Sequence, residues 1–260
     1  MRESLDRFIA RRAKLAWAEA RSAIHGRRVS VDGVVCKHYH RGIGGTEAVS
    51  LDGAPLADGV DDGVILCHKP MGVACSHLPA DAPLLYEMVP AHLRHPDLQA
   101  AGRLDRDTTG LIVLTIDGAL IQGLTGPRRG CWKRYRVRYS GTLAADACAR
   151  VASGLMLPDD PIPCRSARLE VLRWDNASGN GEAVLELCEG RHHQVKRMIA
   201  ALGGRVTALH RDRVGGLDLP HDLPYGGMRP ATPAELAVLP VAVLPVVVSS
   251  LGVAEGARHP

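Results

Sequence analysis

The sequence predicts an α+β fold built on a largely antiparallel or mixed sheet, and two patterns support this prediction. Short stretches with the two-residue alternation of strands recur along the chain, as in residues 133–139 and 182–188. A few amphipathic helices lie between them without a regular strand–helix–strand rhythm, which argues against a parallel α/β sheet. With 260 residues, 46% of them hydrophobic and 23% charged, the chain fits a large domain accompanied by a smaller one.

The first 45 residues are expected to form the smaller unit. Two helices are predicted, each with an apolar face: Leu5, Phe8 and Ile9 in the first, then Trp17, Ala20 and Ile24 in the second. Gly26 ends the second helix, and Asp32-Gly33 is a strong hairpin turn between alternating strands. Two helices followed by a hairpin resemble the S4 RNA-binding module, whose second helix and following loop contact RNA backbone. That resemblance assigns RNA contacts to Arg21, Arg27 and Arg28.

The charge of this unit points in the same direction. Residues 1–45 hold ten Lys or Arg against four Asp or Glu, a local charge of +6, whereas the whole chain carries only +4. A basic module on a near-neutral body suggests a polyanionic partner, most simply nucleic acid. The alternative is an ordinary solvated basic surface. No recognition-helix pattern favours a DNA-binding protein.

The larger unit is expected to begin after a linker rich in Gly, Ala and Asp, which places the domain boundary at residue 60. A strand from Val64 leads into the turn Lys69-Pro-Met-Gly, and the apolar run 111–116 reads as a buried strand closed by Asp-Gly. Later, an amphipathic helix is stopped by Gly203-Gly204; its apolar stripe is Val195, Met198, Ile199 and Leu202.

The stretch 133–139 is expected to form a strand with two different faces. One face carries Lys133, Tyr135, Val137 and Tyr139, and the other carries Arg134, Arg136 and Arg138. In residues 182–188 the inward positions are Ala183, Leu185 and Leu187.

The most informative motif is Ala-Gly-Arg-Leu-Asp-Arg-Asp-Thr-Thr-Gly at residues 101–110. It holds Asp105 in a tight loop before a buried strand, a common way to place one reactive carboxylate. The motif resembles the signature of RNA pseudouridine synthases, in the ribosomal small subunit pseudouridine synthase A family. The resemblance implies that Asp105 is the catalytic carboxylate. The alternative is that Asp105 only caps the turn.

Two further motifs extend the resemblance. In Cys-Trp-Lys-Arg-Tyr-Arg-Val, Tyr135 matches the active-site tyrosine of the family; otherwise it is a core aromatic residue. In Glu-Gly-Arg-His-His-Gln-Val-Lys, Lys196 matches the basic residue that pairs with the catalytic Asp; otherwise it is a solvated helix lysine. The resemblance also suggests that Arg103 holds the flipped nucleotide. Arg191 and His193 are expected to support the RNA-binding cleft or to start the helix.

The resemblance further implies a mixed-sheet synthase domain over residues 61–236, behind the S4-like domain of residues 1–60. It implies a cofactor-free isomerase acting on one uridine of 16S ribosomal RNA, within an assembly intermediate of the small subunit. A synthase acting on 23S ribosomal RNA and a non-catalytic assembly factor remain alternatives. Residues 237–260 form an apolar, proline-interrupted tail of unassigned role, too short and interrupted for a membrane span.

The seven cysteines are scattered and odd in number, without a Cys-x-x-Cys pair, and the first 17 residues carry no apolar signal segment. We therefore expect free thiols in a cytoplasmic protein, a monomer, with no membrane partner. Cys36, His38 and His40 alternate and are expected to face one side of a strand. They lack a convincing fourth ligand for structural zinc, so no metal site is expected.

Overall fold

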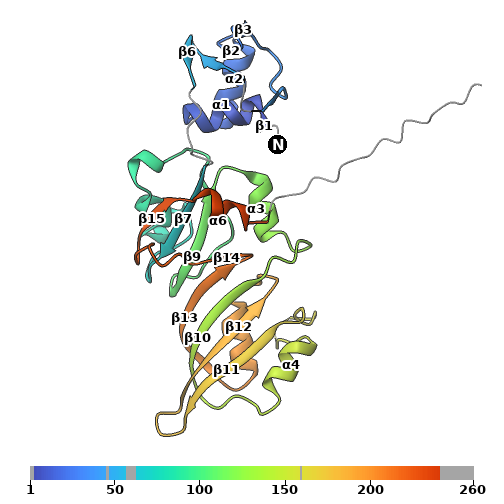
Figure 1. The fold of residues 1–260 in the computed structure, drawn as a ribbon. Helices are drawn as coiled ribbons and strands as arrows, with labels where there is room; N and C mark the ends of the chain where they lie inside the picture. The colour runs from blue at the N-terminus through green and yellow to red at the C-terminus, as the bar shows by residue number, and fades with distance from the viewer. Residues whose placement is uncertain (1–2, 45–46, 57–62, 159, 241–260) are drawn as a thin grey trace, which may run out of the picture.

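A computed structural model describes residues 3–44, 47–56, 63–158 and 160–240 (Figure 1). The N-terminal module contains two helices, a two-stranded sheet (β1–β4) and a four-stranded sheet in the order β3-β2-β5-β6. Its elements are β1 (Glu3–Ser4), α1 (Leu5–Ala13), α2 (Trp17–His25), β2 (Val29–Val31), β3 (Val34–Val35), β4 (Gly42–Ile43), β5 (Val49–Leu51) and β6 (Ala54–Pro55).

The expected pair of helices and the hairpin are confirmed in this module. Asp32 and Gly33 both have positive φ (53° and 78°), the backbone that a tight two-residue hairpin turn requires, and Gly favours it because it has no Cβ. Ala20 and Ile24 of α2 are buried as expected. Trp17 departs from the expected apolar face and is 45% exposed, because its indole nitrogen turns to donate to Asp6.

The body is built on one sheet, nine-stranded over the described residues, in the order β11-β12-β10-β13-β9-β7-β15, with β14 beside β13 and β8 beside β9. The strands are β7 (Val64–Lys69), β8 (Gln99–Ala100), β9 (Thr108–Thr115), β10 (Lys133–Ser140), β11 (Arg168–Asp175), β12 (Asn180–Leu187), β13 (Arg205–Val214), β14 (Leu217–Asp218) and β15 (Met228–Pro230). The helices are α3 (Gly118–Thr125), α4 (Ala147–Ser153), α5 (Gln194–Ala201) and α6 (Pro233–Ala237), with one-turn 3-10 helices at Pro79–Asp81, Leu85–Met88 and Ala91–Leu93.

Two half-sheets meet along a short seam in the middle of this sheet. All pairings are antiparallel except β9–β13, which is parallel and covers only Thr108–Leu209, Thr109–His210 and Gly110–Arg211. Figure 1 shows β7, β9 and β15 above this seam and β10 to β12 below it. The sheet is therefore mixed but largely antiparallel, and the expected α+β fold is confirmed.

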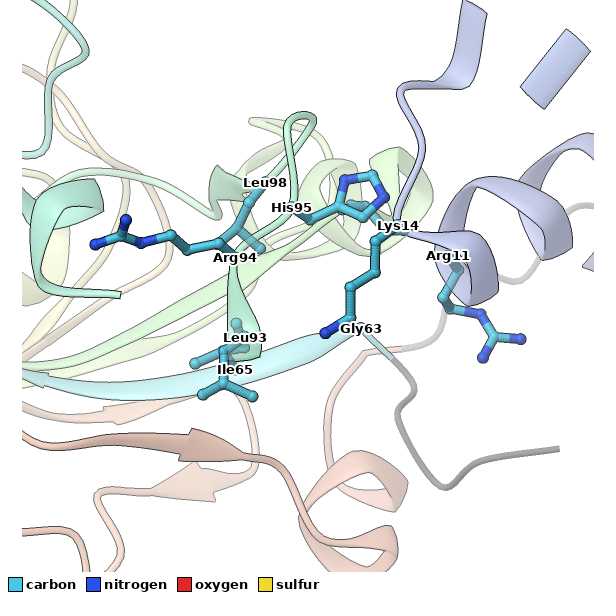
Figure 2. A pocket seen from close by; sticks show the side chains of 9 residues that line it. Arg11, Lys14, Gly63, Ile65, Leu93, Arg94, His95 and Leu98 are labelled. Atoms are coloured by element: carbon cyan, nitrogen blue, oxygen red, sulfur yellow. The ribbon is translucent and has the colours of Figure 1, made fainter. Parts of the chain in front are cut away.

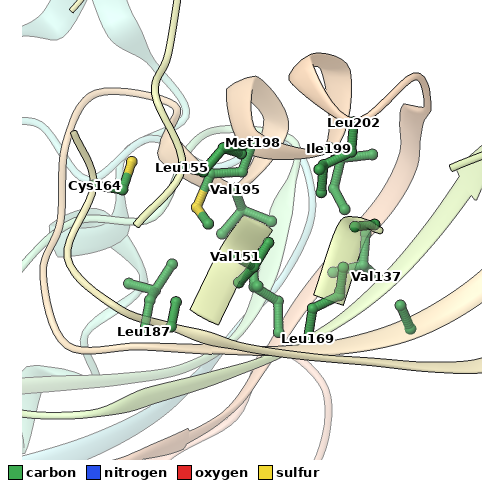
Figure 3. Packing of buried hydrophobic residues seen from close by; sticks show 14 of the residues in the cluster. Val137, Val151, Leu155, Cys164, Leu169, Leu187, Val195, Met198, Ile199 and Leu202 are labelled. Carbon is green, nitrogen blue, oxygen red and sulfur yellow. The ribbon is translucent and has the colours of Figure 1, made fainter. Parts of the chain in front are cut away.

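The lower half has one covered face. Alternating residues of β10 and β12 pack against α4 and α5, as Figure 3 shows for Val137, Val151 and Met198. The expected stripe of α5 is confirmed, since its four residues are all buried: Val195, Met198, Ile199 and Leu202. The expected inward residues of β12 are buried as well: Ala183, Leu185 and Leu187. Sequence periodicity thus identified this core, because apolar side chains repeat with the period of each element.

The N-terminal module contacts the upper half of the body through α1 and the start of α2. Lys14 Nζ donates to the carbonyl of His92, and His95 Nε2 lies 2.8 Å from the carbonyl oxygen of Ala10. The backbone N–H of Trp17 donates to Asp97 at 2.6 Å. Figure 2 shows the small cavity of about 30 Å³ that remains between α1 and this body segment.

The boundary predicted at residue 60 lies outside the described residues, as do residues 241–260 of the predicted tail. The first part of that tail packs on the body, because Leu239 is buried with the core residues of α3 and β9. Among the described residues, no helix has the length and apolar character needed to cross a membrane.

Candidate active site

An open depression of about 460 Å³ lies where the two half-sheets meet. Three segments form it: the turn after β7, the loop before β9, and the first turn of α5. Its lining consists of Met71, Gly72, Asp105, Arg106, Asp107, His193 and Lys196. It is therefore assembled from both halves of the body.

The centre of this depression is an ion pair between Asp105 and Lys196. Lys196 Nζ lies 2.9 Å from Asp105 Oδ2 and 2.6 Å from Asp107 Oδ1, so one ammonium serves two carboxylates. His193 Nε2 lies 3.5 Å from the other oxygen of Asp105. The Asp105 side chain is 30% exposed and that of Lys196 26% exposed, so both remain open to a ligand. The expected pairing of these two residues is present in the structure.

The start of α5 is fixed by polar contacts of its own. His193, the residue before the helix, has positive φ (49°), and its ring stacks on His192 with centroids 3.8 Å apart. The backbone N–H of Arg191 donates to the buried side chain of Gln194 at 2.9 Å. These contacts aim the first turn of α5, and with it Lys196, toward Asp105.

The loop that carries Asp105 is held in place by a buried lysine of the upper half-sheet. Lys69, the last residue of β7, is fully buried, and its ammonium donates to the carbonyls of Pro70 and Thr108 at 2.9 and 2.8 Å. It also approaches the carbonyl of Arg106 at 3.4 Å. The Arg106 side chain in turn donates to the carbonyl of Gly72 at 2.9 Å. The loop is therefore tied to the turn after β7 at several points and is held in place before a ligand arrives.

The position of Gly110 in the sheet explains why the motif of residues 101–110 ends in glycine. Gly110 lies in the parallel seam opposite Arg211 with φ of 115°, and a Cβ there would come within 2.2 Å of the Arg211 carbonyl oxygen. A side chain at this position would push the two half-sheets apart.

The charges of the depression stabilise one another. Burial lowers the pKa of Lys196, but its hydrogen bonds to Asp107 and Asp105 outweigh this and raise the pKa above its ordinary value. Burial likewise opposes ionisation of Asp107, yet the Lys196 hydrogen bond and charge lower its pKa. Burial lowers the pKa of Lys69. Lys196 therefore stays charged and Asp107 stays ionised at neutral pH.

The other residues expected at the site lie around it rather than in its lining. Tyr135 is half-buried and packs against both the lower core and the cluster containing Leu104, the neighbour of Asp105. Arg103 is exposed outside the lining. Arg191 holds the segment after residue 159, because its guanidinium donates to Asp160 at 2.8 Å and to the carbonyls of Ile162 and Pro163, each at 2.7 Å.

Sequence reasoning did not assign to the site four lining residues, Met71, Gly72, Arg106 and Asp107, or the supporting Lys69. Asp107 lies two positions after Asp105 in the same motif, which was a usable signal. The role of Lys69 depends on backbone carbonyls, two of them in the distant segment 106–108, and no pattern of side chains reveals those.

The three arginines of the N-terminal module that were expected to contact RNA differ in their surroundings. Arg21 donates to the buried carboxylate of Asp6 at 2.9 Å, and its guanidinium lies over the rings of Trp17 and Tyr39 at 4.2 and 4.6 Å. Arg28 forms a double hydrogen bond with Asp52. Within the described part of the module, Arg27 is exposed, and its side chain makes no ion pair or hydrogen bond.

Cys36, His38 and His40 do not share a strand face, because β3 ends at Val35. Cys36 is buried, and its thiol approaches the His38 carbonyl, whereas the ring of His40 contacts that of Tyr39 in a tilted arrangement. In the described ranges, no group of three or more His, Cys, Asp or Glu side chains is arranged to hold a metal ion.

Comparison with known proteins agrees with this site. A family model for RNA pseudouridylate synthase matches residues 63–201, which include the lining of the depression and strands from both halves of the sheet. The chain is 38% identical over 233 residues to ribosomal small subunit pseudouridine synthase A of Salmonella typhimurium and 37% identical to that of Escherichia coli K12. Each match covers 90% of this chain and 98% of the relative. A crystal structure of a pseudouridylate synthase superimposes with a TM-score of 0.61 at 34% identity, covering 91% of this chain and 99% of that one.

The fold, the site and these similarities define an isomerase that works on RNA uridines. The chain belongs to the RNA pseudouridylate synthase family. Within that family, the resemblance to the ribosomal small subunit pseudouridine synthase A group is confirmed over nine tenths of the chain.

Proposed function

We propose that this enzyme converts a specific uridine of 16S ribosomal RNA to pseudouridine, with Asp105 as its catalytic carboxylate. The observation that carries the proposal is the ion pair of Asp105 with Lys196 in an open depression, on a loop that Lys69 holds in place. The names of the similar proteins from Salmonella and Escherichia support the small ribosomal subunit as the source of the substrate.

The chemistry requires one carboxylate and no redox partner. The bond from C1′ to N1 breaks, the base turns, and a bond from C1′ to C5 forms; the C5 proton leaves and N1 gains a proton. The carboxylate starts the reaction either by attacking C1′ or by removing a proton from the sugar, and both steps need it ionised. The Lys196 ammonium lies 2.9 Å from Asp105 Oδ2, so a cation faces the carboxylate that the reaction uses.

The base must leave its stack to reach the depression, at a cost of a few kcal/mol. Tyr135 is assigned to stack on the turned base, supported by its position between the lower core and the Leu104 cluster. Arg103, exposed beside the loop, is assigned to the backbone of the flipped nucleotide. His193, 3.5 Å from Asp105, is assigned to the rim of the binding cleft, and Arg191 to holding that rim.

The substrate is proposed to be an assembly intermediate of the small subunit in the cytoplasm, bound by a monomer. Mapping pseudouridines in ribosomal RNA from cells with and without this protein tests the assignment. Loss of one site in 16S RNA is expected. Loss of a site in 23S RNA instead would identify 23S ribosomal RNA as the substrate. An unchanged map would favour a non-catalytic assembly factor.

Chelators are expected to leave the rate unchanged, because the atom balance needs no metal or redox group and the proposed catalytic set is one carboxylate with a lysine and a tyrosine. Tritium release from RNA labelled at uridine C5, measured with and without EDTA, checks this expectation. Inactivation by EDTA that zinc reverses would contradict the proposed chemistry.

Arg27→Gln is expected to weaken RNA binding without unfolding the N-terminal module. Its exposed guanidinium has no ion pair there, and losing one phosphate contact lowers the log–log salt slope by about 0.7 to 0.9. Arg21→Gln should instead destabilise the module by about 1–3 kcal/mol, because it leaves the buried Asp6 without its cation. Salt titrations and thermal melts of both variants separate these effects, and an unchanged slope for Arg27→Gln would remove it from the RNA contact.

A further inference from the structure

The lower half of the sheet has a second face that neither α4 nor α5 covers. Val137 and Tyr139 of β10 point into the helix-covered core, so the alternate residues of this strand and their neighbours on β12 and β11 point the other way. We call this surface the arginine face. Its arginines are Arg134, Arg136 and Arg138 of β10, Arg168 and Arg173 of β11, and Arg213 of β13.

Two carboxylates of this face, Glu182 and Asp212, are each shared by two arginines. Glu182 pairs with Arg138 at 3.2 Å and with Arg173 at 3.3 Å. Both arginine side chains are 71% exposed, whereas that of Glu182 is 36% exposed. Asp212 is likewise shared by two arginines, Arg134 and Arg136, at 2.8 Å each. Asp218, which pairs with Arg134 and Arg213, is 54% exposed, and Glu186 pairs with Arg168. The six arginines outnumber the four carboxylates that pair with them, and around Glu182 the guanidinium groups are the outer layer.

A series of contacts connects the depression to this face. Met71 lines the depression, and its backbone N–H donates to the hydroxyl of Tyr225 at 2.7 Å. The Tyr225 ring is exposed and meets the ring of His68 edge-on, with centroids 5.4 Å apart. His68 in turn lies 5.5 Å from the ring of His210, which is the cross-strand partner of Arg136.

Tyr225 is held rigidly at this junction. The backbone N–H of Gly226 donates to the carbonyl of His68, and the N–H of His68 donates to the carbonyl of Gly227. An exposed aromatic ring on a fixed backbone is a platform on which an unpaired base can stack.

We propose that the RNA strand flanking the target uridine leaves the depression over Tyr225 and runs along the arginine face. The inference rests on the proposed function, since it takes the same RNA as its ligand. Turning one uridine out of its stack leaves neighbouring bases without a partner, and Tyr225 replaces that partner for one of them. The guanidinium groups beyond it bind successive phosphates, for which their planar fork of donors is well suited.

The test compares RNA binding by wild type and five full-length variants, with a transcript of 16S ribosomal RNA as the probe; the arginine and glutamate variants are measured over a range of salt concentrations. The double variant Arg138→Gln with Arg173→Gln should lower the log–log salt slope by about 1.4 to 1.8, the loss of two phosphate contacts. Glu182→Gln is the matched variant, because it removes the shared carboxylate and frees both arginines; its affinity should equal or exceed that of wild type. Arg165 is an exposed arginine outside the arginine face, so Arg165→Gln should leave the salt slope unchanged.

A slope for the double variant equal to that of Arg165→Gln, with an intact melting transition, would overturn the inference. If wild type still forms pseudouridine in that transcript, the proposed function stands and only the RNA path is wrong. Tyr225→Ala should weaken binding about tenfold or more, whereas Tyr225→Phe, which keeps the ring, should stay within about threefold of wild type. Equal losses in both variants would show that Tyr225 acts through its bond to Met71 and not by stacking.

Discussion

Asp105→Asn is expected to abolish pseudouridine formation while leaving the fold intact. Asparagine has the size of aspartate but can neither attack C1′ nor accept the proton, so the single-turnover rate should fall by at least about 10⁴-fold. The fold should survive because the Asp105 side chain is partly exposed and its loop is held independently by the backbone contacts of Lys69. Tritium release from C5-labelled RNA measures the rate, and circular dichroism measures the fold.

Asp107→Asn is the matched control for that experiment. Asp107 shares the Lys196 ammonium but is 63% exposed, and the reaction uses only one carboxylate. Its loss is expected to cost about tenfold or less, since one exposed ion pair contributes little. If Asp107→Asn is inactive and Asp105→Asn remains active, the roles of the two carboxylates are reversed.

Lys196→Met should be far more damaging than Lys196→Arg. Methionine keeps a long side chain on α5 but leaves Asp105 and Asp107 facing each other without a cation, so we expect a loss of about 10²-fold or more in single-turnover rate. Arginine keeps the charge and should retain substantial activity, with some loss because its planar group differs in shape. A Met variant as fast as wild type would show that Lys196 is only a surface lysine.

The pH dependence of the wild type provides a second measurement. Burial lowers the pKa of Lys196, but hydrogen bonds to Asp107 and Asp105 outweigh it and raise the pKa above its ordinary value, so its charge is lost only at strongly alkaline pH. Burial raises the pKa of Asp107, but the Lys196 hydrogen bond and charge outweigh it and lower the pKa below its ordinary value, so its charge is lost only at strongly acidic pH. The Lys196–Asp107 ion pair should therefore persist across the range between these extremes. Inactivation of the wild type near neutral pH would have to come from another group.

Much of the body could be predicted from sequence because its elements repeat apolar side chains with a clear period. The strand β10 and the helix α5 were found in this way, and so was the pairing of Lys196 with Asp105, through the family motif. The contacts of the arginines were harder to predict from sequence, because an arginine side chain alone does not reveal its partner. Arg21 and Arg191 are bound to Asp6 and Asp160, which lie 15 and 31 positions away in the chain. Their RNA contacts, like those of Arg27 and Arg28, stay predictions.

The short parallel seam between β9 and β13 has a consequence for how the enzyme loses activity. Asp105 precedes β9 in the upper half, and Lys196 belongs to α5 in the lower half, so the proposed catalytic pair spans the seam. Within the sheet, only three residue pairs hold that seam, and one of them is the tight contact at Gly110. A small rotation of one half against the other separates the pair. Warming or mild denaturant should therefore abolish catalysis while both halves are still folded. A bound RNA that contacts both halves would hold them in their active arrangement.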